Sequence, residues 1–199
     1  MWLVGFWPLG KVNSGTWMKG LIFSEFLEYV ESTYSAEMVD DIIDACSLSS
    51  DGAYTTVGSY PHEELVSLVA VLGEHLGISP SEILRSFGNY LFDRLIVGFP
   101  HFIHDAKSAF ELLYRIEEYM NQEVCKLYPD AKLPAFAYES NHPNHLTIIY
   151  YSTRPFAGLA HGMIEGVVKH FGEDITIERE PSLGDEKAGV RFSLVLRET

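Results

Sequence analysis

The chain has 199 residues, of which 47% are hydrophobic and 21% charged. This composition is typical of one compact domain with its own core. The 28 acidic and 14 basic residues give a formal net charge of −14, which repels nucleic-acid phosphates and anionic membranes, so neither is expected as a partner. The two cysteines form no CxxC motif or disulfide framework, which favours a reducing, cytoplasmic location.

Residues 1–17 are apolar, are interrupted by Pro8 and carry no basic segment at their start. Their uninterrupted apolar run is too short to span a bilayer, and they lack the pattern of a secretory signal. We expect residues 1–17 to be a disordered extension and residues 18–199 to form a single domain.

The first part of the domain has helical periodicity, with apolar residues recurring at spacings of three and four. Ser79 and Glu82 have the spacing of a capping box around Pro80, and Gly77 stands where a preceding helix would end. We expect helices over about 18–30, 35–48, 61–77, 80–97 and 106–128.

After residue 129 the pattern changes to short β-rich runs, the first two separated by the turn-forming residues 141–144. We expect strands over 135–139, 146–152, 174–179 and 190–197, and a helix over about 155–172. Helices first and strands last predict an α+β fold, with an N-terminal helical half packed beside a C-terminal antiparallel sheet of about four strands with a helix.

Motifs of common enzymes are absent from the sequence: it has no G-x-S-x-G elbow, no H-E-x-x-H and no phosphate-binding glycine loop. We therefore expect no catalytic site. His101 and His104 lie beside Asp105 with a spacing that suits a metal, but they fall in a predicted turn between helices, where a metal site is the less frequent outcome.

Three polar residues stand where the second strand meets the next helix, namely Tyr150, Ser152 and Arg154. Alternate residues of a strand share a face, so this spacing would present two hydroxyls and a guanidinium together. Such a set binds carboxylates, and the helix after Pro155 adds backbone N–H donors. Taken alone the motif also arises by chance, and an arginine at a strand end usually faces water.

Three segments together resemble the heme nitric oxide/oxygen binding (H-NOX) family: residues 18–23, residues 86–92 and the Tyr150-x-Ser152-x-Arg154 motif. They occur in the order and spacing typical of that family, and the resemblance covers about residues 18–197. It implies a ferrous heme b between the helical half and the sheet half, with the propionates held by Tyr150, Ser152 and Arg154.

The resemblance also implies apolar heme contacts from Ile22, Phe26 and Pro134, which are equally explained as ordinary core residues. Leu159 stands at the distal position where oxygen-binding members carry a hydrogen-bonding tyrosine. Because leucine offers no donor to bound dioxygen, the resemblance implies a sensor of nitric oxide and carbon monoxide.

The main departure from the family is at Asn121, which stands at the position of the proximal histidine. An asparagine amide is a poor iron ligand beside a neutral imidazole. Cys125, one turn later, offers a thiolate as an alternative metal ligand, although a buried cysteine is usually an inert small hydrophobe.

The sequence is compatible with three outcomes: heme with a weaker axial ligand, another flat or acidic ligand on Arg154, or an interaction module without a ligand. We expect a stand-alone heme-binding nitric oxide sensor that signals to a separate protein, such as a histidine kinase or a diguanylate cyclase. The alternative is a heme-free H-NOX-like ligand-binding or protein-interaction module that lost the axial histidine.

Overall fold

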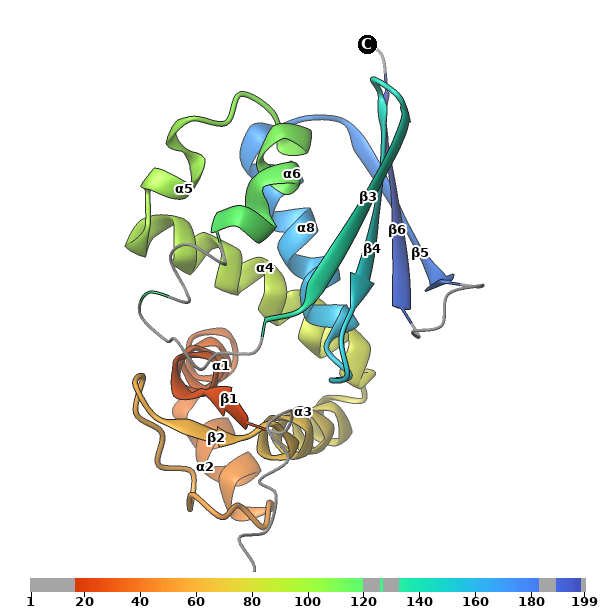
Figure 1. Cartoon of the computed structure of the whole chain (residues 1–199). Coiled ribbons are helices and arrows are strands. Elements are labelled where there is room, and N and C mark those ends of the chain that lie inside the picture. The colour runs from red at the N-terminus through yellow and green to blue at the C-terminus, as the bar shows by residue number, and fades with distance from the viewer. Residues whose placement is uncertain (1–16, 120–125, 127–132, 183–188, 198–199) are drawn as a thin grey trace, which may run out of the picture.

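The elements of the protein follow the predicted order, with helices first and an antiparallel sheet last, which confirms the α+β prediction (Figure 1). The computed structural model describes residues 17–119, 126, 133–182 and 189–197. The disordered extension expected for residues 1–17 thus lies outside the described residues, except for Trp17, which begins a short strand.

The N-terminal part consists of β1 (Trp17–Lys19), α1 (Gly20–Thr33), α2 (Ala36–Asp44), β2 (Ser59–Pro61) and α3 (His62–Leu76). The three helices confirm the periodicity, and Ser35 caps α2 by accepting a hydrogen bond from the Met38 N–H at 3.1 Å. The ribbon of β1 and β2 was not expected, because three residues are too few for an alternating pattern to be recognised.

Helix α4 (Pro80–Gly98) starts as the capping box predicts. The Ser79 hydroxyl accepts from the Glu82 N–H at 3.3 Å, and the Glu82 carboxylate accepts from the Ser79 N–H at 3.2 Å. The preceding helix α3 ends at Gly77, whose φ of 67° is a left-handed conformation that glycine adopts without strain.

Two further helices follow, α5 (His101–His104) and α6 (Ala109–Tyr119). The segment of His101 and His104 is therefore a helical turn of its own and not only a connection. Helix α6 is the described part of the helix expected over 106–128, whose second half lies largely outside the described residues.

The C-terminal part consists of β3 (Ala135–His142), β4 (His145–Tyr151), α8 (Ala157–Phe171), β5 (Ile175–Ser182) and β6 (Gly189–Leu196). The strands form one antiparallel sheet in the order β3-β4-β6-β5, so β4 is an inner strand. In the register, Tyr150 on β4 lies between Phe136 on β3 and Val190 on β6.

Two hydrophobic cores lie on either side of a helix pair formed by α4 and α8. The first core is built on α1, α3 and α4, and the second is built on the sheet, α6 and α8. Helix α4 contributes Phe87 and Leu91 to the first core and Phe92 to the second. Figure 1 shows α4 joining the lower helical part to the part that contains the sheet.

Helices α4 and α8 cross at close range because glycines stand at the crossing. A Cβ added to Gly162 would collide with the Arg85 carbonyl oxygen, and one added to Gly88 would collide with the Leu159 carbonyl oxygen. The backbones of α4 and α8 can therefore approach each other closely at these glycines.

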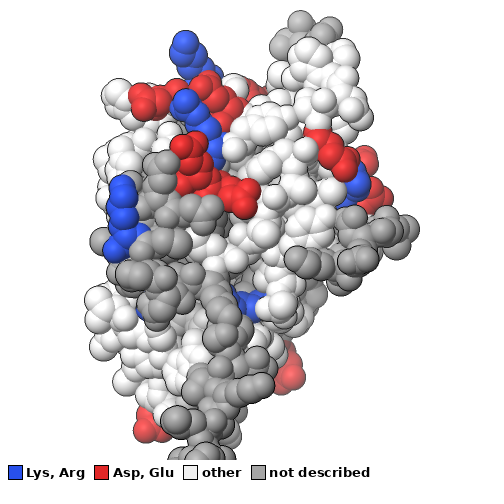
Figure 2. Space-filling view, viewed as in Figure 1, with Lys and Arg blue, Asp and Glu red and all other residues white. Residues whose placement is uncertain are grey.

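Charge is unevenly distributed over the face shown in Figure 2. Charged side chains gather near α6 and again at the edge of the sheet, whereas the described surface between the helices and the sheet is mostly uncharged. Among the described residues, no helix is both long and apolar enough to cross a membrane.

Candidate functional site

Tyr150 lies near the end of β4 with its ring in the second core. The residue is 8% exposed, and the ring centroids of Tyr150 and Phe136 are 5.8 Å apart. Burial raises the pKa of Tyr150, and this rise is reduced by a hydrogen bond with Ser152 and by the charge of Arg154. The phenol is therefore neutral at physiological pH and lies next to both other residues of the motif.

Ser152 and Arg154 come together through a turn and not through the alternation of a strand. Strand β4 ends at Tyr151, and the Ser152 hydroxyl accepts a hydrogen bond from the Arg154 N–H at 3.1 Å. Serine often closes such local turns by bonding to the backbone two residues on. The predicted grouping of the three residues is observed, but the reason expected for it, one extended strand, is wrong.

The Arg154 side chain is only partly exposed and reaches the N-terminal ribbon. Its Nη2 donates a hydrogen bond to the Trp17 carbonyl oxygen on β1 at 2.7 Å. Burial lowers the pKa of the Arg154 guanidinium, while the nearby Tyr150 and the Glu63 carboxylate of α3 raise it. Arginine stays charged under these conditions, so a cation is held where β1, α3 and the end of β4 meet.

The sequence does not indicate the contacts that Trp17 and Glu63 make with Arg154. Trp17 acts through a backbone carbonyl, which every residue possesses, so no side-chain pattern could have identified it. Glu63 is one of two adjacent acidic residues in the first turn of α3, and nothing in the sequence relates it to residue 154.

The apolar residues predicted to contact the cofactor lie mainly in the first core. Phe26 is fully buried and meets Phe87 edge to face, with ring centroids 5.2 Å apart. Ile22 and Leu159 pack against the same core but stay partly exposed, and Pro134 is partly exposed just before β3. Phe26 is thus part of the core, whereas the other three keep some exposed surface.

The predicted metal-binding positions, Asn121 and Cys125, lie outside the described residues. Within the described part of the chain, no group of three or more histidine, cysteine, aspartate or glutamate residues is arranged to hold a metal ion. His104 instead contacts the neighbouring Asp105, with its Nδ1 3.1 Å from the carboxylate oxygen, and both side chains are exposed.

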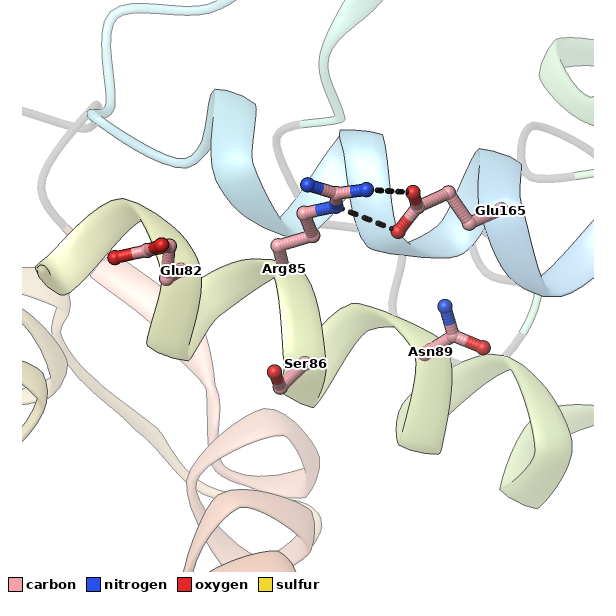
Figure 3. A pocket seen from close by; sticks show the side chains of 5 residues that line it. All are labelled: Glu82, Arg85, Ser86, Asn89 and Glu165. Atoms are coloured by element: carbon pink, nitrogen blue, oxygen red, sulfur yellow. Dashed lines mark hydrogen bonds and ion pairs between the residues drawn. The ribbon is translucent and has the colours of Figure 1, made fainter. Parts of the chain in front are cut away.

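A separate groove of about 480 Å³ lies on the outer side of α4 and α8 (Figure 3). Arg85 crosses it and binds both carboxylate oxygens of Glu165, the Nε contact being 2.8 Å long. Glu82, Ser86 and Asn89 complete the lining, and none of the predicted site residues belongs to it. The groove is polar, its arginine is already neutralised, and it is distinct from the motif at the end of β4.

The described residues fit the carboxylate-bearing edge of a heme. Tyr150, Ser152 and Arg154 provide two hydroxyl groups and one guanidinium within a single turn of chain, which is the donor set that a carboxylate requires. Ile22, Leu159 and Pro134 are apolar and partly exposed.

Comparison with solved structures gives close matches over nearly the whole chain. The Fe(II) unliganded H-NOX protein from K. algicida is 34% identical, with a TM-score of 0.83, over 92% of this chain and 98% of that chain. The H-NOX from Shewanella woodyi, determined with IWP-051 bound in the Fe(II)CO ligation state, is 39% identical, with a TM-score of 0.75, over 89% of this chain and 94% of that one.

An H-NOX protein from S. oneidensis in the Fe(II)NO ligation state is 23% identical, with a TM-score of 0.81, over 91% of this chain and the whole of that one, which is a likeness of fold. No curated protein matches this chain. The model of the Haem-NO-binding family matches residues 19–179. The chain therefore belongs to the Haem-NO-binding family, whose H-NOX domains are heme-based gas sensors.

Proposed function

We propose that this protein is a heme b-binding sensor domain that responds to nitric oxide or carbon monoxide. The observation that carries the proposal is the partly buried Arg154, held beside Tyr150 and Ser152 at the junction of the two halves. In that position the guanidinium would bind a heme propionate, and the two hydroxyls would donate to the carboxylate oxygens. Bound heme would supply a ferrous iron that takes up the diatomic gas.

Leu159 supports the choice of gas. Its side chain packs against the first core at the start of α8, at the position where oxygen-binding members carry a tyrosine. An alkyl side chain donates no hydrogen bond to dioxygen, and we therefore propose selectivity for nitric oxide and carbon monoxide.

Asn121 favours a second candidate, a heme-free module of the same fold. It occupies the family's proximal histidine position, and an amide is a poor ligand for iron. The module would bind another acidic ligand through Arg154 or would act through protein contacts alone. In the heme-binding case the iron would have a weak axial ligand, from Asn121 itself or from Cys125.

We propose that this domain signals to a separate protein, such as a histidine kinase or a diguanylate cyclase, and does not itself catalyse a reaction. The two cores share α4 and α8, so a ligand that binds between the halves would act on both. A movement of one half relative to the other on ligand binding requires contacts that differ in strength between the free and the bound state.

The test is an absorption spectrum of the full chain after loading with ferrous heme, recorded before and after addition of nitric oxide. A Soret band that shifts with the gas is expected. Absence of a band after reconstitution would refute the heme sensor and favour the heme-free module.

Three variants, one of them a control, assign the residues when heme is titrated into the full chain and followed by absorption. Arg154→Ala should weaken heme binding by about tenfold or more, because it removes a charge-assisted contact, whereas Arg197→Ala, at an exposed position after β6, should leave it unchanged. Asn121→His should produce the spectrum of a histidine-ligated ferrous heme. Equal affinities of the two arginine variants would refute the anchor, and an unchanged spectrum would refute the position assigned to the ligand.

A further inference from the structure

Strand β1 supplies a hydrogen-bond acceptor to the arginine of the candidate site. The Trp17 carbonyl oxygen accepts from Arg154 Nη2 at 2.7 Å, across 137 positions of sequence. This contact joins the N-terminal ribbon to the loop after β4. The role that we assign to this contact rests on the proposed function.

The register of the ribbon explains why this carbonyl is available. Gly20 donates its N–H to the Gly58 carbonyl oxygen at 2.9 Å, so Gly20 and Gly58 are a hydrogen-bonded pair of the ribbon. In an antiparallel ribbon, hydrogen-bonded pairs alternate with non-bonded pairs along each strand. Trp17 lies opposite Pro61 at a non-bonded position, and proline has no N–H to offer. The Trp17 carbonyl is therefore not used by β2.

The acceptor is also held firmly in place. Met18, the next residue, is 9% exposed and belongs to the first core, and Lys19 Nζ donates to Ser59 Oγ at 3.0 Å. Because Met18 packs in the core, packing holds the position of the neighbouring Trp17 carbonyl.

The Arg154 side chain has four rotatable bonds, and ordering it costs conformational entropy that a ligand would otherwise have to supply. The Ser152 hydroxyl fixes the backbone of Arg154, and the Trp17 carbonyl fixes its guanidinium. Together they hold both ends of the side chain before a ligand arrives.

We propose that the Trp17 carbonyl on β1 is a positioning element of the carboxylate site, acting through Arg154 to strengthen binding of a carboxylate-bearing tetrapyrrole. One Nη2 hydrogen is committed to the carbonyl, and the orientation of the guanidinium toward the ligand is thereby set. The contrary role is competition, in which the carbonyl withholds the arginine from the ligand.

The experiment replaces single amides of the full chain by esters and titrates metal-free protoporphyrin IX, which needs no axial ligand. The α-hydroxy analogue of methionine at position 18 makes the Trp17 carbonyl an ester carbonyl, a weaker acceptor, and removes one ribbon N–H. The control is the α-hydroxy analogue of glycine at position 20, which removes the Gly20 N–H bond to Gly58 and leaves the Trp17 carbonyl unchanged.

The ester at position 18 should weaken protoporphyrin IX binding by about fivefold, as expected for loss of part of a hydrogen bond to a charged group. The control ester should leave the affinity unchanged, and so should the ester at position 18 when the probe is protoporphyrin dimethyl ester. In an Arg154→Ala background the ester at position 18 should have no further effect.

Equal effects of the two esters on affinity would show that the contact between the Trp17 carbonyl and Arg154 has only a structural role, and would overturn the proposal. Tighter binding with the ester at position 18 would overturn it in favour of competition. If the unmodified full chain binds no porphyrin, the proposed function itself fails, and the positioning role fails with it. Binding without any difference between the chains would overturn the positioning role alone.

Discussion

Glu64 on α3 is a buried carboxylate that accepts hydrogen bonds from the loop between α2 and β2. The residue is 5% exposed, and it accepts from the Ser49 N–H at 3.1 Å, from Ser50 Oγ at 2.6 Å and from the Tyr54 hydroxyl at 2.8 Å. The Ser49 hydroxyl is a further donor. The hydrogen bonds from the loop between α2 and β2 satisfy the buried anion, as its burial requires. In return, this one side chain holds the loop in its shape.

Replacing this carboxylate by an amide should destabilise the fold. Glu64→Gln exchanges one acceptor oxygen for an NH2 group that faces hydroxyl donors, and we expect a loss of about 1–3 kcal/mol in the free energy of unfolding. The measurement is urea unfolding followed by circular dichroism. Glu74→Gln, at an exposed position on the same helix, is the control and should change stability little; equal losses in both variants would contradict the assignment.

The same residue makes a specific contribution to pH dependence. Burial acts to raise the pKa of Glu64, but the hydrogen bonds from Ser49, Ser50 and Tyr54 outweigh it and lower the pKa. A lowered folded pKa stabilises the protein above the unfolded value of about 4.3 and ceases to do so as the pH falls through the folded value. The stability difference between the wild type and Glu64→Gln should therefore be largest near neutral pH and shrink in acid. A difference that grows in acid would contradict the sign.

At the candidate site the sequence predicted which residues meet, and the structure decided how. Tyr150, Ser152 and Arg154 are close in sequence, so almost any local conformation keeps them near one another. The turn that Ser152 closes and the Trp17 carbonyl that receives Arg154 were not predictable, since one is a choice of local hydrogen bond and the other a contact between distant segments.

At the scale of elements, the crossing of α4 and α8 depends on small residues. Gly158 and Gly162 on α8 each face a backbone carbonyl of α4, at Ser81 and Arg85. Backbone atoms cannot rotate away as side chains do, so an added methyl group must separate the helices.

We expect Gly162→Ala to lower the free energy of unfolding by about 1–3 kcal/mol or more through this overpacking. The control is Gly98→Ala at the last residue of α4, where an added Cβ meets nothing within 4 Å and where alanine should be neutral or slightly stabilising. Thermal unfolding of both variants checks this. A Gly162 variant as stable as the Gly98 variant would show that the helices can move apart at little cost.

The longer elements were predictable because each carries a repeated local signal. The capping box of α4 is an example: Ser79 and Glu82 bond as their spacing predicts. The ribbon of β1 and β2 carries no such signal, since its strands have three residues each and are held by pairing between segments about 40 positions apart.

At the scale of the whole molecule, the excess of acidic residues should weaken stability at low salt. With a formal net charge of −14, like charges repel across the folded surface, and this repulsion is screened at distances beyond about 10 Å in 0.1 M salt. We expect the melting temperature to rise by a few degrees as NaCl is increased from low to physiological concentration. A nonionic osmolyte at equal osmolality is the control, and a melting temperature that falls with NaCl would show that local ion pairs outweigh the repulsion.

The sequence by itself determined the class of fold, the main helices and strands and the motif of the candidate site, because these depend on periodicity, capping residues and short spacing. Only the tertiary structure decided that β1 and β2 pair, that α4 and α8 cross on glycines and that Arg154 is held by the Trp17 carbonyl. Each of these is a contact between segments distant in sequence in which at least one partner is a backbone atom that every residue shares. The side-chain pattern of a segment reflects the periodicity and capping of its own helix or strand, whereas backbone contacts between elements form only when the chain folds.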